Sequence, residues 1–373
     1  MNAHAKIASP TGSTTLHVDV ADLRNALAFT SRAIERRNTI PILGQHLFVV
    51  TDGALEIHAT NLDLHAIQRV ECKAQGSWSF VIGGWRLRKL ISGMAGAVSF
   101  TMNAAKETLT FQAADITLTL KTIFPAAEWP ALKLGAPNKT AIFGEAALHQ
   151  ALRYVTPCIS TEATRYYLNG VFWPAGKPGE QCRFVSTDGH RLARYDFDGP
   201  SAPRSMIIPS TAVSYMQDMT VRGGNGSIQL TPRKNKVLSI TNGVQTIHAK
   251  EIEGNYPDYT RVIPKDGGVV DVVVGKEAAQ RLCSVFSAGR APHCKISPSL
   301  GVITAHLDDG DISIPLGTTK PDTPDVGFNV HYLRGLTRIA GDLRLQSHDA
   351  GGPARLTNED APGLLYILMP CRV

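Results

Sequence analysis

The chain has 373 residues, which is too long for one small core and enough for two or three domains. Hydrophobic residues make up 43% and charged residues 19%, as in an ordinary soluble globular protein, and no run of about 18 apolar residues predicts a membrane span. The formal net charge of +6 favours an anionic partner, but charge alone does not establish nucleic-acid binding.

Residues 1–14 are small and polar and lack the apolar core of a secretory signal, so we expect a disordered extension there. The six cysteines, at positions 72, 158, 182, 283, 294 and 371, form no CxxC pair. They therefore lack the spacing of zinc ligands, and free thiols in a reducing cytoplasm are the simplest interpretation. We expect a cytoplasmic protein with no metal and no cofactor.

Three similar segments recur after 125 and then 130 residues, at 16–34, 141–159 and 271–289. Each reads as a short apolar strand, a turn with an acidic residue, and a helix with apolar residues at helical spacing. A second set of segments, in which a strand again leads into a helix, lies at 80–94, 207–219 and 328–340. The sequence therefore predicts six strand–helix units in three pairs, and three domains of similar construction.

Most of the remaining sequence alternates apolar and polar residues between Gly, Asn and Asp turns, as at 116–120 and 302–304. A pattern of many strands and few helices predicts an α+β fold in which helices pack on antiparallel sheets.

Basic side chains share faces on several predicted helices, whereas acidic ones lie mostly in first turns, where the helix dipole favours them. The basic residues of interest on or beside these helices are Arg24, Arg32, Arg86, Arg153, Arg334 and Arg338. One basic helix face usually just meets solvent, but recurrence on equivalent helices suits a surface that contacts phosphates without reading bases.

The string at 186–193 contains Ser186, Asp188 and His190, the residue types of a hydrolase triad. We favour a structural interpretation, because 182–187 and 190–197 both look like strands and the Asp-Gly between them is a hairpin signal. The sequence contains no GxSxG, HExxH or phosphate-loop motif, and no acidic cluster that resembles a two-metal site. These features favour a protein that acts by its shape and not as an enzyme.

Eight strings, spread in family order over residues 16–373, resemble the beta subunit of bacterial DNA polymerase III, the sliding clamp family. They are TIPIL (39–43), ATNLDL (59–64), FPAAEWP (124–130), RYYLNG (165–170), TDGHRLA (187–193), YPDY with RVIP (256–259 and 261–264), GFNV (327–330) and YILMPCRV (366–373). TDGHRLA, RYYLNG and the final string are specific when they occur together.

The resemblance implies the DNA clamp fold, with domains at 15–138, 139–268 and 269–373 that place helices inside and antiparallel sheets outside. It implies a head-to-tail homodimeric ring that encircles duplex DNA, independently of its sequence, and tethers the replicative polymerase. The implied partners bind through short linear peptides: the DNA polymerase III alpha subunit, the clamp loader, other DNA polymerases and mismatch-repair proteins. No membrane partner is implied.

In this family a hollow between the second and third domains binds those peptides as an apolar pit with a few orienting polar groups. Carried over position by position, it comprises Leu168, Thr187, Gly189, His190, Arg191, Leu192, Pro257, Arg261, Val262, Asn329, Tyr332, Ile367, Leu368, Met369, Pro370 and Arg372. The family has a methionine where this chain has Cys371, which makes one wall smaller.

For DNA contact the resemblance points to Arg37, Tyr166 and Tyr167. Other positions depart from the family: one basic pair reads Trp85-Arg86, another reads Ser210-Thr211, and a glutamine is replaced by Glu162. These changes reduce the positive charge of the hole. They raise an alternative, a diverged clamp paralogue that binds partner peptides but loads poorly on DNA.

Ring closure is expected between the edge strand with Leu118 and Leu120 and the helix with Val285 and Phe286. Phe286 lies at apolar helical spacing, so it could equally belong to a core.

Overall fold

The structure is a computed structural model that describes residues 13–35, 39–103, 106, 108–113, 116–121, 124–130, 132–177, 179–265, 267–278, 280–281, 293–307, 310–316, 320 and 322–372. The chain divides into two compact units. Unit 1 comprises Met1–Thr140 and Ile228–Lys250, and unit 2 comprises Ala141–Ser227 and Glu251–Val373. Across these described ranges, no helix has the length and apolar character needed to cross a membrane.

The first sheet of unit 1 is antiparallel and has the strand order β5-β1-β7-β8-β9. Its strands are β5 (Lys73–Ala74), β1 (Ser13–Asp19), β7 (Ala97–Asn103), β8 (Thr108–Ala113) and β9 (Ile116–Lys121). Among the described strands, β9 pairs only with β8, so it is an edge strand that can accept a further partner.

Within unit 1, the strands of the second sheet run in the order β15-β16-β17-β4-β3-β2-β6. Its strands are β15 (Ser227–Pro232), β16 (Val237–Thr241), β17 (Gln245–Lys250), β4 (Leu64–Glu71), β3 (Ala54–Thr60), β2 (His46–Thr51) and β6 (Trp78–Ile82). Adjacent strands are antiparallel.

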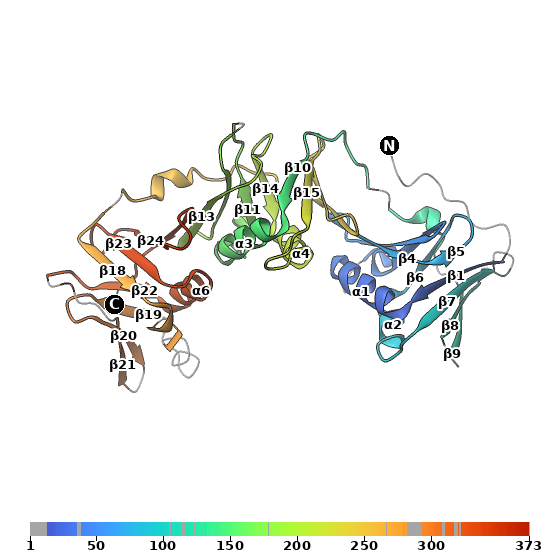
Figure 1. Cartoon of the computed structure of the whole chain (residues 1–373), viewed down its shortest axis with the longest axis horizontal. Coiled ribbons are helices and arrows are strands. Elements are labelled where there is room, and N and C mark those ends of the chain that lie inside the picture. The colour runs from blue at the N-terminus through green and yellow to red at the C-terminus, as the bar shows by residue number, and fades with distance from the viewer. Residues whose placement is uncertain are drawn as a thin grey trace. The chain divides into compact units, whose positions relative to one another are not determined.

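Helices α1 (Val20–Thr30) and α2 (Gly84–Leu90) pack in unit 1 (Figure 1). Asp19 begins α1 by accepting a hydrogen bond from the Ala21 amide at 2.7 Å. The helix buries its Leu23 and Leu27 side chains in a core with aromatic rings from both sheets, such as Phe100. Burial of this apolar face, more than helix propensity, holds α1 in place.

The main sheet of unit 2 runs in the order β14-β11-β12-β13-β25-β24-β23-β18. Its strands are β14 (Met206–Pro209), β11 (Gly170–Trp173), β12 (Cys182–Thr187), β13 (Arg191–Phe197), β25 (Leu364–Leu368), β24 (Ala354–Thr357), β23 (Leu343–Ser347) and β18 (Val270–Val274). Strand β25 lies between β13 and β24, so segments far apart in the sequence share one sheet.

Unit 2 also contains a smaller antiparallel sheet, in the order β21-β20-β19-β22, and three described helices. The strands are β21 (Gly310–Pro315), β20 (Val302–Leu307), β19 (His293–Ser297) and β22 (Val326–Asn329). The helices are α3 (Glu145–Val155), which follows β10 (Ala141–Gly144), α4 (Ser210–Met219) and α6 (Val330–Ala340).

Five of the six predicted strand–helix units are present in full: β1–α1, β6–α2, β10–α3, β14–α4 and β22–α6. The sixth begins with β18 and continues into positions outside the described residues. The α+β prediction is confirmed. The domain boundaries proposed after residues 138 and 268 stay a prediction.

Candidate functional site

A cavity of about 290 Å³ opens on the surface of unit 2, and we call it the unit 2 pocket. Its lining comes from four segments of the chain: the 165–168 loop, the β12–β13 hairpin, the 257–262 loop and β25. The lining residues are Arg165, Tyr167, Leu168, Thr187, Gly189, His190, Arg191, Leu192, Pro257, Asp258, Tyr259, Val262, Ile367 and Met369.

The turn of the β12–β13 hairpin forms one wall. Asp188 Oδ1 accepts hydrogen bonds from the backbone amides of His190 at 2.9 Å and Arg191 at 3.0 Å. Thr187 Oγ1 accepts from the Gly189 amide at 3.1 Å and donates to the Arg191 carbonyl at 2.8 Å. Gly189 has a φ of +90°, which only glycine adopts without strain. The predicted Asp-Gly hairpin is therefore confirmed, and its side chains fix the wall.

A small apolar cluster forms the floor of the pocket. Leu192 and Ile367 are buried in it, and the rings of Phe172 and Tyr256 stack against it with centroids 4.6 Å apart. Burial raises the pKa of the Tyr256 hydroxyl well above its ordinary value, so this side chain is neutral at physiological pH. An apolar floor under an open pocket suits leucine- or phenylalanine-like side chains.

Strand β25 shows how alternation selects the lining. Ile367 lines the pocket, whereas Leu368, which pairs with Arg191 in the ladder, is fully buried and does not. After the strand, the Met369 amide donates to the His190 carbonyl at 2.9 Å, and the Met369 side chain is 40% exposed in the pocket. The Cys371 amide donates to the Gly327 carbonyl at 2.9 Å, which holds the segment after the pocket in place.

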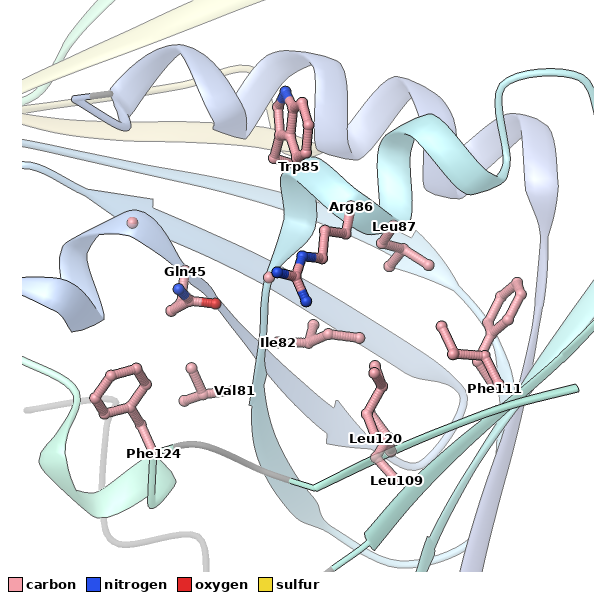
Figure 2. A pocket seen from close by; sticks show the side chains of 13 residues that line it. Gln45, Val81, Ile82, Trp85, Arg86, Leu87, Leu109, Phe111, Leu120 and Phe124 are labelled. Carbon is pink, nitrogen blue, oxygen red and sulfur yellow. The ribbon is translucent and has the colours of Figure 1, made fainter. Parts of the chain in front are cut away.

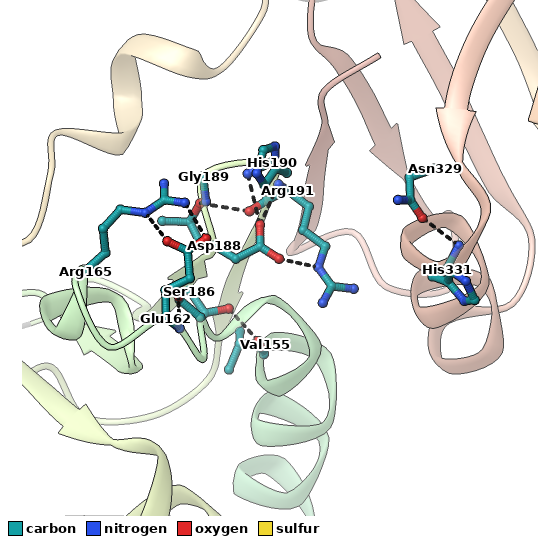
Figure 3. Close-up of polar contacts among 12 residues, drawn as sticks. Val155, Glu162, Arg165, Ser186, Asp188, Gly189, His190, Arg191, Asn329 and His331 are labelled. Carbon is teal, nitrogen blue, oxygen red and sulfur yellow. Dashed lines mark hydrogen bonds and ion pairs between the residues drawn. The ribbon is translucent and has the colours of Figure 1, made fainter. Parts of the chain in front are cut away.

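The polar end of the pocket carries two arginines in fixed positions (Figure 3). Arg191 Nε donates to Asp188 Oδ2 at 2.9 Å, and its guanidinium carbon lies 4.5 Å from the centre of the Tyr332 ring. The Arg165 guanidinium pairs with Glu162 through two hydrogen bonds, of 2.8 and 2.7 Å. These groups can orient a polar ligand atom beside the apolar floor.

Ten of the sixteen positions assigned to the hollow line this pocket: Leu168, Thr187, Gly189, His190, Arg191, Leu192, Pro257, Val262, Ile367 and Met369. The six that do not are Arg261, Asn329, Tyr332, Leu368, Pro370 and Arg372. The Arg261 side chain is 82% exposed and pairs with Asp258 at 3.1 Å. Asn329 instead begins α6, where its side chain accepts from the His331 amide.

Four lining residues were not among those sixteen positions. The sequence predicts DNA contact for Tyr167 and no site role for Arg165, Asp258 and Tyr259, yet all four line the pocket. All four lie within or beside the RYYLNG and YPDY strings, and this proximity was the only signal in the sequence that could have found them.

The residues assigned to DNA contact occupy different environments. Arg32 and Arg86 are exposed, Arg153 is half-buried, and the Tyr166 side chain is 54% exposed. Arg37 lies outside the described residues, as do the side chains of Arg334 and Arg338 on α6.

Arg24 has a structural role that the sequence did not predict. Its Nη2 donates to the carbonyl oxygens of Ile91 at 3.1 Å and Met94 at 2.6 Å, at the end of α2. These carbonyls need partners because a helix leaves its last C=O groups unbonded. The capping contact occupies Nη2, and the phosphate contact predicted for Arg24 stays a prediction.

Leu118 and Leu120, assigned to ring closure, line a second cavity of about 330 Å³ in unit 1 (Figure 2). Arg86 reaches from α2 into this cavity toward Gln45, and the neighbouring Trp85 side chain is 62% exposed. Val285 and Phe286 lie outside the described residues.

The hydrolase triad is contradicted by the position of Ser186. Its side chain is fully buried, and its hydroxyl donates to the Val155 carbonyl at the end of α3 (Figure 3). The His190 ring stacks on Tyr332 instead, with centroids 6.2 Å apart. Within the described ranges, no group of three His, Cys, Asp or Glu side chains could hold a metal ion.

Two family models match the chain and together cover more than half of it. They are the N-terminal domain of the DNA polymerase III beta subunit at residues 14–133 and its central domain at residues 144–258. The beta sliding clamp of Caulobacter vibrioides is 28% identical over 96% of this chain and 100% of its own length. The beta sliding clamp of Escherichia coli K12 is 24% identical over 95% of this chain and 99% of its own length.

Solved structures agree with this similarity. The Caulobacter crescentus beta sliding clamp with PEG bound has a TM-score of 0.87 and 26% identity, and covers 98% of this chain and 100% of its own. A sliding clamp from Bartonella birtlesii bound to griselimycin has a TM-score of 0.86 and 25% identity. The match covers 97% of this chain and 100% of that structure's chain. The chain therefore belongs to the family of the DNA polymerase III beta subunit and is a sliding clamp of DNA replication.

Proposed function

We propose that this chain is a non-catalytic processivity clamp, in which two copies close head to tail around duplex DNA and partner proteins dock peptides in the unit 2 pocket. The observation that carries the proposal is the pocket itself, where an apolar floor meets a polar hairpin wall. The division at 15–138, 139–268 and 269–373 is part of this proposal. The proposed partners are the DNA polymerase III alpha subunit, the clamp loader, other DNA polymerases and mismatch-repair proteins.

The peptide would bind by placing apolar side chains over Leu192 and Ile367 and by turning its polar atoms toward the hairpin. A pocket of about 290 Å³ has room for one or two such side chains, so affinity would come from a short motif and not from a broad interface. Partners that share one short motif would compete for this pocket.

DNA attraction in the proposed ring would be weak and diffuse. Arg32, Arg153 and Tyr166 supply exposed or half-exposed groups on the helices and loops, whereas Arg86 lines the cavity proposed for ring closure. Long-range attraction to phosphates without fixed hydrogen bonds retains the ring and lets it slide. The alternative of a paralogue that fails to load is not favoured, because the similarity to sliding clamps runs through 96% of the chain.

Ring closure would use β9, the edge strand of the first sheet of unit 1. Its Leu118 and Leu120 line the unit 1 cavity, whose mostly apolar lining suits a large apolar side chain of a second copy. The Val285–Phe286 segment of the second copy is the proposed occupant.

Retention on DNA tests the proposal as a whole. The full-length protein is loaded on nicked circular DNA with a clamp loader and separated from free protein by gel filtration. We expect it to elute with the circle and to be lost after the circle is linearised, since a ring can then slide off an end. Protein that stays bound to linear DNA would contradict encirclement. Protein that binds motif peptides but never loads would support the paralogue.

A further inference from the structure

Glu162 and Arg165 form a forked ion pair in the loop that precedes the short helix Tyr166–Leu168 (Figure 3). Arg165 Nε donates to Oε2 of Glu162 at 2.8 Å, and Nη2 donates to Oε1 at 2.7 Å. The Glu162 backbone is also fixed, because its amide donates to Ser160 Oγ and its carbonyl accepts from the Asn169 side chain, both at 3.1 Å. The carboxylate therefore has a fixed position although the side chain is half-exposed.

The third nitrogen of the guanidinium, Nη1, lies against the pocket wall. A β-carbon added at Gly189 would collide with this atom, so Nη1 packs on the glycine backbone. In the described part of the chain, Nη1 has no hydrogen-bond acceptor, whereas Nε and Nη2 are both occupied by Glu162. Its two N–H groups thus remain for a ligand at the polar end of the pocket.

The pair also sets the local charge. The Arg165 guanidinium holds the pKa of the Glu162 carboxyl below its ordinary value, so the carboxylate is ionised at physiological pH. Arg165 consequently presents donors to the pocket with its charge largely balanced. A neutral amide or carbonyl oxygen can accept from Nη1, while a ligand carboxylate would meet Arg165 and Glu162 together and gain little.

We propose that Glu162 is a positioning and specificity-determining residue of the unit 2 pocket. It holds Arg165 so that Nη1 donates to an uncharged oxygen of the bound peptide, and it removes the preference for a carboxylate that an unpaired arginine would create. The inference rests on the proposed peptide-binding function.

Two fluorescein-labelled peptides, Gln-Leu-Ser-Leu-Phe and Glu-Leu-Ser-Leu-Phe, test the inference by anisotropy titration of the full-length protein. Glu162→Gln keeps the size of the side chain but loses one acceptor and the charge. We expect this variant to bind the Gln peptide about threefold more weakly than the wild type does. The ratio of Glu peptide affinity to Gln peptide affinity should rise about tenfold, because the free-energy change is about that of one charge-assisted hydrogen bond. The gain for the Glu peptide should fade as salt is raised.

Arg165→Lys keeps the charge but cannot form the fork. We expect it to weaken the Gln peptide about tenfold. Glu162→Gln added to Arg165→Lys should still raise the ratio of Glu to Gln peptide affinity, because it leaves the lysine charge without its carboxylate. Asp271→Asn is the matched control, because Asp271 accepts a similar forked pair from Arg344, at 2.9 and 2.7 Å, away from the pocket lining. It should leave both affinities unchanged.

The outcomes separate the two proposals. If neither peptide binds the wild-type protein, the proposed peptide-binding function is wrong. If both bind and Glu162→Gln changes them by the same factor or not at all, peptide binding stands and the role given to Glu162 is overturned.

Discussion

The guanidinium carbon of Arg191 lies 4.5 Å from the centre of the Tyr332 ring, on which the His190 ring also stacks. Tyr332 belongs to α6 and does not line the unit 2 pocket, whereas His190 and Arg191 do. One tyrosine therefore supports the hairpin wall from behind, through a cation–π contact with an arginine that Asp188 holds on its other side.

Replacing Tyr332 by Leu should weaken peptide binding about two- to fivefold, since an exposed cation–π contact is worth about 0.5–1 kcal/mol. Tyr332→Phe keeps the ring face and should bind nearly as well as the wild type. Anisotropy titration with the Gln-Leu-Ser-Leu-Phe peptide measures both. Equal losses in the two variants would show that the hydroxyl, not the ring face, matters.

Ser186→Ala should lower the free energy of unfolding by about 1–3 kcal/mol, because it leaves the buried Val155 carbonyl without its donor. Urea denaturation followed by circular dichroism gives the value. Ser201→Ala is the control, since the Ser201 hydroxyl donates to the Lys177 and Glu180 carbonyls at an exposed site of the same unit. A similar small loss in both variants would contradict a buried structural role for Ser186.

His46 should make stability depend on pH. Burial lowers the pKa of its ring to about 3, so folded His46 stays neutral while the unfolded chain gains a proton below the ordinary pKa of about 6.5. Its stabilising contribution is complete above pH 6.5 and should fall by about 1.4 kcal/mol per pH unit as the pH drops toward 3.

Urea denaturation of the wild type and of His46→Gln at pH 7, 6 and 5 isolates this contribution. The wild type should lose stability more steeply than the variant below pH 6.5. Parallel curves for the two proteins would mean that His46 is protonated in the folded state.

Leu118→Arg should convert the proposed dimer to monomer, because a second cation beside Arg86 in the unit 1 cavity would have to be desolvated at the interface. Sedimentation velocity gives the mass. Thr117→Arg is the control, since Thr117 is exposed on the same strand and does not line the cavity. A dimer that tolerates Leu118→Arg would rule out this edge as the interface.

Local features of the fold could be predicted from the sequence. The hairpin at Asp188-Gly189 depends on a turn whose hydrogen bonds lie within five residues, and the strand–helix units depend on periodicity within short windows. These local sequence signals can be read without knowing how distant segments of the chain pack together.

Contacts between distant segments could not be predicted in this way. Arg24 finds its acceptors at Ile91 and Met94, which only the packing of α1 beside α2 brings within reach. The family resemblance placed both Ile367 and Leu368 of β25 in the peptide-binding hollow. The pairing of β25 in the sheet determines that Ile367 lines the pocket and Leu368 does not. The Glu162–Arg165 fork depends on a loop conformation that no periodic pattern encodes.

The insertion of β25 between β13 and β24 has a consequence for biosynthesis. The ribosome makes the hairpin wall long before residues 364–369, which supply the opposite wall and the Met369 contact to His190. If the unit 2 pocket binds partner peptides as we propose, a nascent chain that has reached only β24 has half a pocket and would not compete with finished molecules for those partners. Recruitment of partners through the pocket would then report that β25 has been translated.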